Sequence, residues 1–149
     1  TYSFDLIPVT DDTVALTLGT PVSGAIAHAG QVDRHTFTLT ERKLVVFDSL
    51  ADTGLAWSLV GPTGTIVANR SFQASDSRDI GAGTALDLGP GNYAVVIDPS
   101  GETTGAYAFA LLDLGTATPL TPGTPVAGVL EPGNETAMYR FGANAGDRY

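Results

Sequence analysis

Residues 32–50 read VDRHTFTLTERKLVVFDSL, and the two halves of this stretch predict two kinds of β-strand. In the first half, His35, Phe37 and Leu39 alternate with polar or charged residues, which are Arg34, Thr36 and Thr38. This period of two predicts a strand with one buried face. Residues 43–50 are more continuously apolar and predict a central strand of a sheet.

Strand-like runs recur along the chain with turn residues between them. They lie at 1–9, 55–60, 61–68, on both sides of Gly89-Pro90-Gly91, and at 105–114. The first of them predicts a half-buried strand through Tyr2, Phe4 and Leu6. Residues 73–83 show no clear period and predict a loop, and no window has the stripe and caps of a helix. About eight or nine strands between Gly19 and Leu114 predict an all-β fold, an antiparallel β-sandwich.

Composition excludes several classes of partner. The 149 residues include 16 acidic and 7 basic ones, for a formal net charge of −9. Nucleic acid is not expected as a partner, because phosphate binding requires a concentrated basic surface. Cysteine is absent, so no disulfide or thiolate nucleophile exists. No signal peptide or apolar run of about 18 residues occurs, so we expect no membrane insertion of this segment. The start at Thr1 suggests an excised or processed chain.

A phrase near the C-terminus repeats one near the N-terminus. Residues 123–141, GTPVAGVLEPGNETAMYRF, follow residues 19–37, GTPVSGAIAHAGQVDRHTF, at a shift of 104 positions. At a shift of 105, a second set of residues also has identical partners: Tyr2, Phe4 and Leu6 match Tyr107, Phe109 and Leu111. Such a long period is typical of whole domains in tandem rather than of a solenoid.

The repeat divides the chain into three parts. We expect residues 1–10 to be the last strand of a preceding unit, 11–114 a complete unit, and 115–149 a linker with the first strands of the next unit. The proline-rich linker predicts a semi-rigid spacer. A single domain of 149 residues with chance similarity is the disfavoured alternative, because identities and spacing persist through both blocks.

The incomplete outer parts raise the question of where their strands find partners. Strands without neighbours must be disordered, pack on the complete unit or pair with another chain. The correspondence of residues 135–149 with 31–45 favours strand exchange between molecules. The candidate inter-repeat or inter-chain contact residues are Tyr2, Phe4, Leu6, Tyr139 and Phe141.

These motifs resemble the bacterial pre-peptidase C-terminal domain. They are a glycine-containing first strand (GTPVSGAI), the strand VDRHTFTL, the strand LGPGNYAVV and the closing strand GAYAFALL. The resemblance covers the complete unit and both flanking parts, and residues 107–141 resemble tandem versions in very large bacterial secreted or surface proteins. It implies a jelly-roll-like β-sandwich, appended to secreted proteases or strung in arrays. Some members bind collagen, polysaccharide or calcium, and many have no known ligand.

Signals for catalysis are missing. The sequence has no G-x-S-x-G, no H-E-x-x-H and no P-loop. His35 is predicted to be a core or inter-strand residue, and His28 a surface turn residue. Trp57 is predicted to lie in the core rather than to stack on a sugar, because Leu55 and Leu59 share its face.

Calcium is the one metal for which the carboxylates of this sequence are candidate ligands. The nearest pairs are Asp98 with Glu102 and Asp76 with Asp79, and neither has the spacing of an EF-hand loop. The collagen-binding relatives use an acidic N-terminal linker for calcium, and here that region offers only Asp11 and Asp12. Solvated turn carboxylates are therefore favoured over a calcium site, and no cofactor is expected.

The sequence favours a non-catalytic structural or spacer repeat of a large bacterial extracellular or cell-surface, adhesin-like protein. Its expected partners are neighbouring repeats or other copies of itself, through exposed strands. The alternative is an accessory module that binds a substrate, such as extracellular-matrix collagen or polysaccharide, for a secreted enzyme. An enzyme is the third hypothesis, and the missing catalytic set disfavours it.

Overall fold

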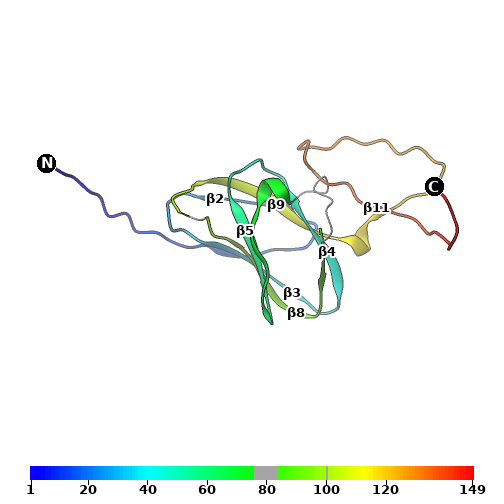
Figure 1. The fold of residues 1–149 in the computed structure, drawn as a ribbon, viewed down its shortest axis with the longest axis horizontal. Coiled ribbons are helices and arrows are strands. Elements are labelled where there is room, and N and C mark those ends of the chain that lie inside the picture. The colour runs from blue at the N-terminus through cyan, green and yellow to red at the C-terminus, as the bar shows by residue number, and fades with distance from the viewer. Residues whose placement is uncertain (76–83, 100) are drawn as a thin grey trace.

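The computed structural model describes residues 1–75, 84–99 and 101–149, and two β-sheets form its centre (Figure 1). The larger sheet has the order β1 (Thr13–Ala15), β3 (Asp33–Leu39), β8 (Gly91–Ile97), β5 (Ala56–Gly61) and β6 (Gly64–Ser71). The smaller sheet has the order β2 (Val22–Ile26), β9 (Gly105–Asp113), β4 (Lys43–Ser49) and β7 (Ala85–Leu88). The remaining elements are a separate pair, β10 (Thr118–Pro119) with β11 (Tyr139–Arg140), and the short 3₁₀ turns η1 (Phe72–Ala74) and η3 (Leu114–Thr116).

The predicted all-β sandwich is confirmed, and the described residues contain no α-helix. Eight strands, β2 to β9, lie between Gly19 and Leu114. All pairings among these eight are antiparallel. The exception in the sandwich is β1, which pairs with β3 in parallel. Of the predicted loop at 73–83, residues 73 and 74 belong to η1, and 76–83 lie outside the described residues.

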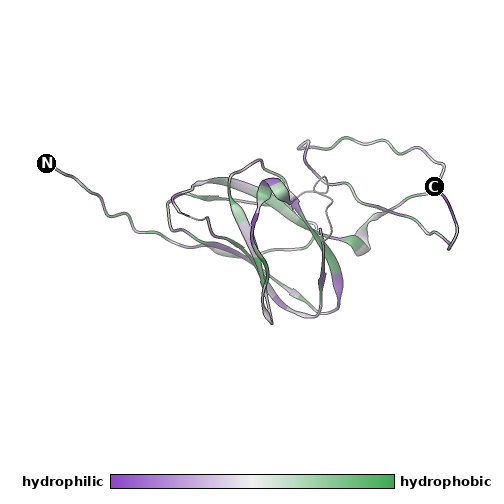
Figure 2. Cartoon of the chain, viewed as in Figure 1, coloured by the Kyte–Doolittle hydropathy of each residue, from purple (hydrophilic) through white to green (hydrophobic). Residues whose placement is uncertain are grey.

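An aromatic cluster fills the space between the sheets. The Phe47 ring of β4 stacks on Trp57 of β5 with centroids 4.0 Å apart, and on Phe109 of β9 at 4.9 Å. Trp57 is buried together with Leu55 and Leu59, as predicted, and its Nε1 donates to Ser75 Oγ at 2.7 Å. Large aromatic side chains supply much of the apolar area that folding buries, so this cluster holds the two sheets together. Figure 2 shows the apolar colour concentrated in the sandwich strands.

The N-terminal residues correct one prediction. Residues 1–10 form no strand, and Tyr2, Phe4 and Leu6 are 89%, 85% and 89% exposed. The prediction of a half-buried strand was wrong because alternation indicates which face a strand would bury but supplies no neighbour to bury it. In Figure 1 this segment runs away from the sandwich, at the end opposite to residues 115–149.

Most of the C-terminal segment, residues 115–149, lies outside the sandwich, although Ala117 near its start is buried. Asn134 Nδ2 donates to the Ser49 carbonyl at 2.6 Å, and the Thr136 amide donates to Asp48 Oδ2 at 3.3 Å. Most of this segment is exposed, including Val129 at 85%. In the described part of the chain, no helix is long and apolar enough to cross a membrane.

Candidate functional site

The C-terminal segment repeats the backbone geometry of the sandwich's first strands. Both copies pair two strands in parallel, and two residue pairs recur at a displacement of 104 positions. Val14 faces His35 and Ala15 faces Thr36 in β1 and β3, while Thr118 faces Tyr139 and Pro119 faces Arg140 in β10 and β11. The repeated phrase therefore folds locally in the same register twice.

Individual hydrogen bonds follow the same shift. Three backbone hydrogen bonds recur. Leu16 N donates to Thr36 O at 2.9 Å, and Leu120 N donates to Arg140 O at 2.7 Å. The other two pairs are Thr20 N to Thr17 O with Thr124 N to Thr121 O, both at 3.1 Å, and Gln31 N to His28 O at 3.2 Å with Glu135 N to Pro132 O at 2.9 Å. A side-chain bond recurs too: the amide of Ala27 donates to Gln31 Oε1 at 2.8 Å, and that of Glu131 to Glu135 Oε2 at 3.1 Å. Gly19 and Gly123 share a left-handed φ, 79° and 83°, which favours glycine at both turns.

The copies differ where β2 should recur. Residues 22–26 form β2, which pairs with β9, and Ile26 is 1% exposed. Residues 126–130 form no strand, and Leu130, the counterpart of Ile26, is 45% exposed. The difference follows from the missing neighbour, because no described strand lies where β9 lies in the first copy. An unpaired strand template therefore remains at residues 126–130.

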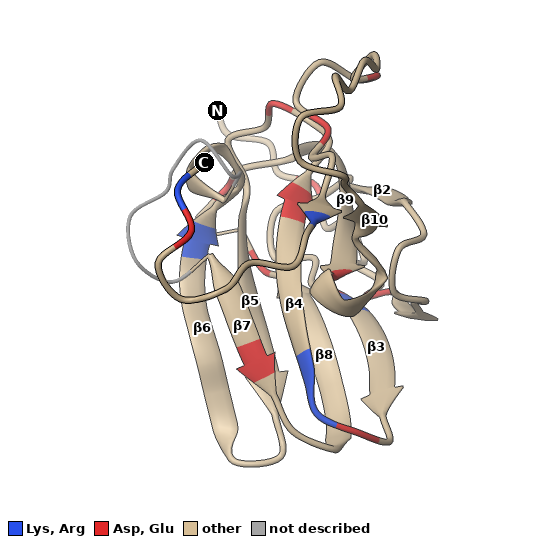
Figure 3. Cartoon of the chain, turned by 90° about the vertical axis from the view of Figure 1, so that its right-hand side faces the viewer, with Lys and Arg blue, Asp and Glu red and all other residues tan. Residues whose placement is uncertain are grey.

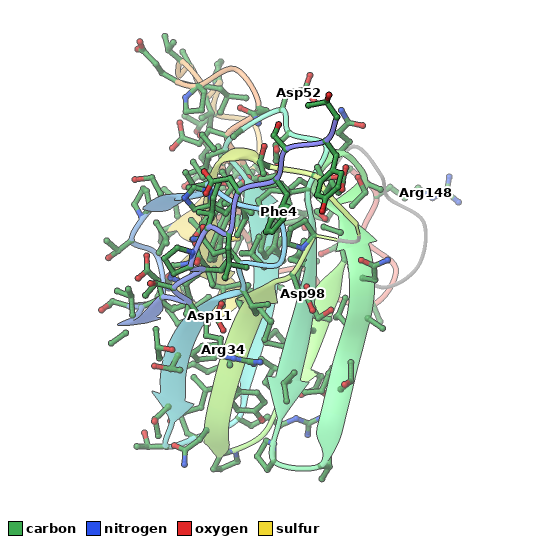
Figure 4. All side chains as sticks on the ribbon, turned by 90° about the vertical axis from the view of Figure 1, so that its left-hand side faces the viewer. Phe4, Asp11, Arg34, Asp52, Asp98 and Arg148 are labelled. Atoms are coloured by element: carbon green, nitrogen blue, oxygen red, sulfur yellow. The ribbon has the colours of Figure 1, made fainter. Side chains whose placement is uncertain are left out.

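The predicted contact residues lie in two separate places. Tyr139 is in β11 and Phe141 just beyond it, 45% and 47% exposed, and the Phe141 ring packs on Tyr149 with centroids 4.9 Å apart. Tyr2, Phe4 and Leu6 lie at the opposite end of the molecule. Figure 4 views that end and labels Phe4 on the N-terminal segment. The structure does not bring the two groups together within one chain.

A buried polar network links the two sheets, and sequence reasoning did not identify it. Tyr107 of β9 donates its hydroxyl hydrogen to Asp33 Oδ2 at 2.7 Å, and His35 Nε2 lies 2.9 Å from the same hydroxyl oxygen. Gln31 Nε2 donates to Asp33 Oδ1 at 2.8 Å. All four residues are buried. The signal in the sequence was Asp33 on the same face as His35, a carboxylate on an otherwise buried face of the strand.

Burial shifts the pKa values of His35 and Tyr107 in this network. Desolvation lowers the pKa of His35, although the nearby carboxylates of Asp33 and Asp12 oppose the shift. Burial, and secondarily the hydrogen bond to Asp33, raises the pKa of Tyr107. His35 Nδ1 has no hydrogen-bond partner among the described residues. Because these side chains are closed off from solvent, their role is to bridge the sheets, and the prediction that His35 is a core residue is confirmed.

Tyr107 also explains one glycine. A Cβ atom at Gly24 of β2 would collide with the Tyr107 hydroxyl and ring. Gly24 faces Tyr107 in the β2–β9 register, so the phenol crosses β2 where no side chain stands. At its counterpart Gly128, a Cβ atom would meet no other described atom within 4 Å, since no strand covers residues 126–130.

The calcium candidates do not form a cluster in the described structure. Asp98 (Figure 4) and Glu102 are exposed, and Asp76 and Asp79 lie outside the described residues. Among the described residues, no three His, Asp or Glu side chains lie close enough together to hold a metal ion. Asp11 instead accepts the Val32 amide hydrogen at 2.9 Å. His28 is exposed in a turn, as predicted.

The larger sheet carries a surface groove. The groove lining includes Thr36, Thr38, Val60 and Asn92. Thr38 Oγ1 donates to Asn92 Oδ1 at 2.8 Å.

The described part of the chain has no basic patch, and Figure 3 shows Lys and Arg scattered among acidic residues. Two of the basic side chains are paired: Arg42 with Asp87, and Lys43 with Asp113 and Glu41.

Fold and surface together define a small β-sandwich module with two unpaired apolar segments. No family model matches the chain, and no curated protein matches it. Among solved structures, it is similar to the pre-peptidase C-terminal domain of collagenase from Bacillus anthracis, at 16% identity and a TM-score of 0.47, covering 72% of this chain and 99% of that one. The sequence motifs of this chain resemble the same kind of domain, and at 16% identity the likeness concerns the fold alone.

Two periplasmic lysozyme inhibitors of g-type lysozyme are also similar in fold. One is a PliG mutant from Escherichia coli, at 15% identity and a TM-score of 0.49, covering 68% of this chain and 99% of that one. The other is PliG from Aeromonas hydrophila, at 8% identity and a TM-score of 0.49, covering 71% and 99%. At such identities the likeness concerns the fold alone.

Proposed function

We propose that this chain is a non-catalytic structural repeat of a large bacterial extracellular or cell-surface protein. The observation that supports it is the recurrence, 104 positions apart, of one strand register and its hydrogen bonds. A segment that repeats the beginning of a sandwich directly after the end of one is what a string of such sandwiches requires. The extended, proline-rich stretch between them then acts as a spacer.

The chemistry of the described residues supports a structural role. Their buried cluster of a histidine, a tyrosine and an aspartate lies between the sheets, where no substrate reaches it. The exposed groups include apolar side chains at the two ends and paired charges on the sandwich. This distribution suits contacts with neighbouring units better than turnover of a small molecule.

The shape of a tandem chain tests this function. A chain of residues 11–149 continued by residues 46–114, which completes the second sandwich in the natural register because Tyr149 corresponds to Val45, should give small-angle scattering of two separated bodies. Replacing Pro119, Pro122 and Pro125 with glycine should broaden the distribution of distances, because glycine removes the stiffness of the spacer. A single compact body, unchanged by these substitutions, would reject the spacer role.

A second candidate is a binding module for collagen or polysaccharide, favoured by the groove on the larger sheet. Its hydroxyl and amide groups at Thr38 and Asn92 are exposed and suit hydroxyl-rich ligands. Retention on insoluble collagen, chitin or cellulose, lost in Thr38→Ala/Asn92→Ala, would support it. No retention on any of the three would reject this candidate.

A further inference from the structure

We propose that residues 1–6 of one copy of this chain pair antiparallel with residues 123–129 of a second copy, with Tyr2 opposite Gly128 and Phe4 opposite Val126. This inference rests on the repeat proposed above and names the partner and register of its contacts. It requires no new fold, because each half of the contact already exists within the sandwich.

The register follows from β2 and β9. In the sandwich Val22 faces Phe109 and Gly24 faces Tyr107. Residues 126–130 repeat β2 at a shift of 104, and residues 2–6 repeat the centre of β9 at a shift of 105. A further bond extends the match, since Gly19 N donates to Leu111 O at 2.7 Å, and the equivalent atoms are Gly123 N and Leu6 O.

The side chains also complement each other. Within the sandwich, His35 lies 5.7 Å from the Tyr107 ring and 5.3 Å from the Phe109 ring, centroid to centroid. The equivalent residues are Tyr139, Tyr2 and Phe4, which are all exposed in the isolated chain. Pairing would therefore gather three exposed aromatic rings into one cluster and remove their apolar area from water.

Glycine at position 128 fits the same arrangement. Gly24 leaves the space that the Tyr107 phenol occupies over β2. Gly128 presents the same open backbone, with no described atom near its Cβ position in the isolated chain. A Tyr2 ring from another copy can lie across it as Tyr107 lies across Gly24.

The partner is a second copy rather than the same chain. Figure 1 places the N-terminal segment and residues 115–149 at opposite ends, with the sandwich between them. Because the two contact surfaces are different, the contact is head to tail, and each added copy leaves one free segment at either end. Copies should thus form open chains whose length grows with protein concentration.

Disulfide trapping tests the register in a chain that has no cysteine of its own. Phe4→Cys and Val126→Cys, mixed as two single variants, should cross-link under mild oxidation at least about tenfold faster than Asp5→Cys with Val126→Cys, because a disulfide needs Cβ atoms about 4 Å apart. The control pair differs by one residue, which turns the thiol to the other face. Equal rates for the two pairs would overturn the proposed register.

A substitution at Gly128 tests the same contact without a thiol. Gly128→Val should abolish concentration-dependent light scattering, because its side chain fills the place of the Tyr2 ring. The matched control Gly133→Val, also at an open position, should leave association unchanged. Association that survives Gly128→Val, or an intrachain disulfide as the main product of a dilute Phe4→Cys/Val126→Cys double variant, would overturn the inference. An elongated tandem chain combined with either result would reject this contact alone and leave the proposed repeat standing.

Discussion

The Tyr107 hydroxyl joins the two sheets at one atom. It donates to Asp33 and lies within hydrogen-bond distance of His35, both on β3, while Tyr107 itself belongs to β9. A buried carboxylate that accepts two hydrogen bonds is tolerated, and one that loses a donor is not. The stability of this fold therefore depends on the hydrogen bonding of buried polar side chains as much as on apolar packing.

Tyr107→Phe should destabilise the sandwich. It removes the donor to Asp33 Oδ2 in a site that is closed to water, which costs about 1–3 kcal/mol. The free energy of unfolding in urea measures the effect. The matched substitution Tyr2→Phe removes a phenol hydroxyl from an exposed ring and should not change the free energy of unfolding. Equal stabilities of Tyr107→Phe and the parent chain would contradict the network.

Gly24→Ala should also be destabilising, since the new Cβ would collide with the Tyr107 hydroxyl. Overpacking of this kind typically costs about 1–3 kcal/mol. Denaturant unfolding of Gly24→Ala beside Gly128→Ala provides the comparison, and the latter should lie within about 0.5 kcal/mol of the parent. An unchanged free energy of unfolding in Gly24→Ala would mean that the close contact between the Tyr107 phenol and β2 is not required.

His35 predicts how stability depends on pH. Its pKa is lowered in the folded state, so the unfolded chain binds more protons as pH falls through about 6.5. The contribution is fully present above that pH and is lost below it. Urea unfolding between about pH 7.5 and 5 should show this loss, and His35→Gln should flatten it. Asp87 and Asp113, whose pKa values are lowered, keep their stabilising contribution throughout this pH range and lose it only as pH falls below about 3.8.

At the scale of elements, period-two alternation predicted the strands that have partners. β3, β8 and β9 bury the residues that the alternation indicated, namely Phe37, Tyr93 and Phe109 among others. The same alternation at Tyr2 and Phe4 was misleading, because hydrogen-bonding neighbours are a property of the whole sheet. β1 was not predicted, since Thr13–Ala15 is too short for a period and its parallel pairing with β3 is set by the fold.

The candidate site was predictable only in part. The sequence identified the apolar residues at both ends and the repeat that relates them to β9 and β3. It did not indicate the network of Gln31, Asp33 and Tyr107, because the partners come from different sheets and no local pattern joins them. Contacts between residues far apart in sequence require the three-dimensional pairing of strands.

The C-terminal segment is an element whose docking can be tested. Asn134→Ala removes its 2.6 Å bond to Ser49, so the amide of Thr118, which bonds to Met138 O, should exchange its hydrogen faster. Hydrogen exchange followed by mass spectrometry measures this, with amides of β8 as an internal reference. Asn144→Ala, which breaks a contact within the segment to Asp147, is the control and should not loosen residues 118–140. Unchanged exchange at Thr118 in Asn134→Ala would contradict docking through Asn134.

At the scale of the whole molecule, the sandwich should fold without its two outer segments. Residues 1–10 are exposed, and Ala117 is the only buried residue of the described segment 115–149, which also contacts the sandwich through Asn134 and Thr136. Truncation tolerance follows from the burial and hydrogen bonding of the removed backbone. Residues 11–114 alone should unfold cooperatively, as circular dichroism in urea would show, and should stay monomeric at concentrations where the full chain associates. Loss of cooperative unfolding would mean that the outer segments belong to the same domain.

The short parallel strand β1 has a mechanical consequence. In a string of these units, tension enters each sandwich through the residues just before β1, a strand of three residues with a single neighbour, β3. Under load, β1 should peel from β3 before the aromatic centre gives way. Each released residue would lengthen the connector by about 3.5 Å. Such a unit would extend reversibly under tension by releasing its edge strand while its core stays folded.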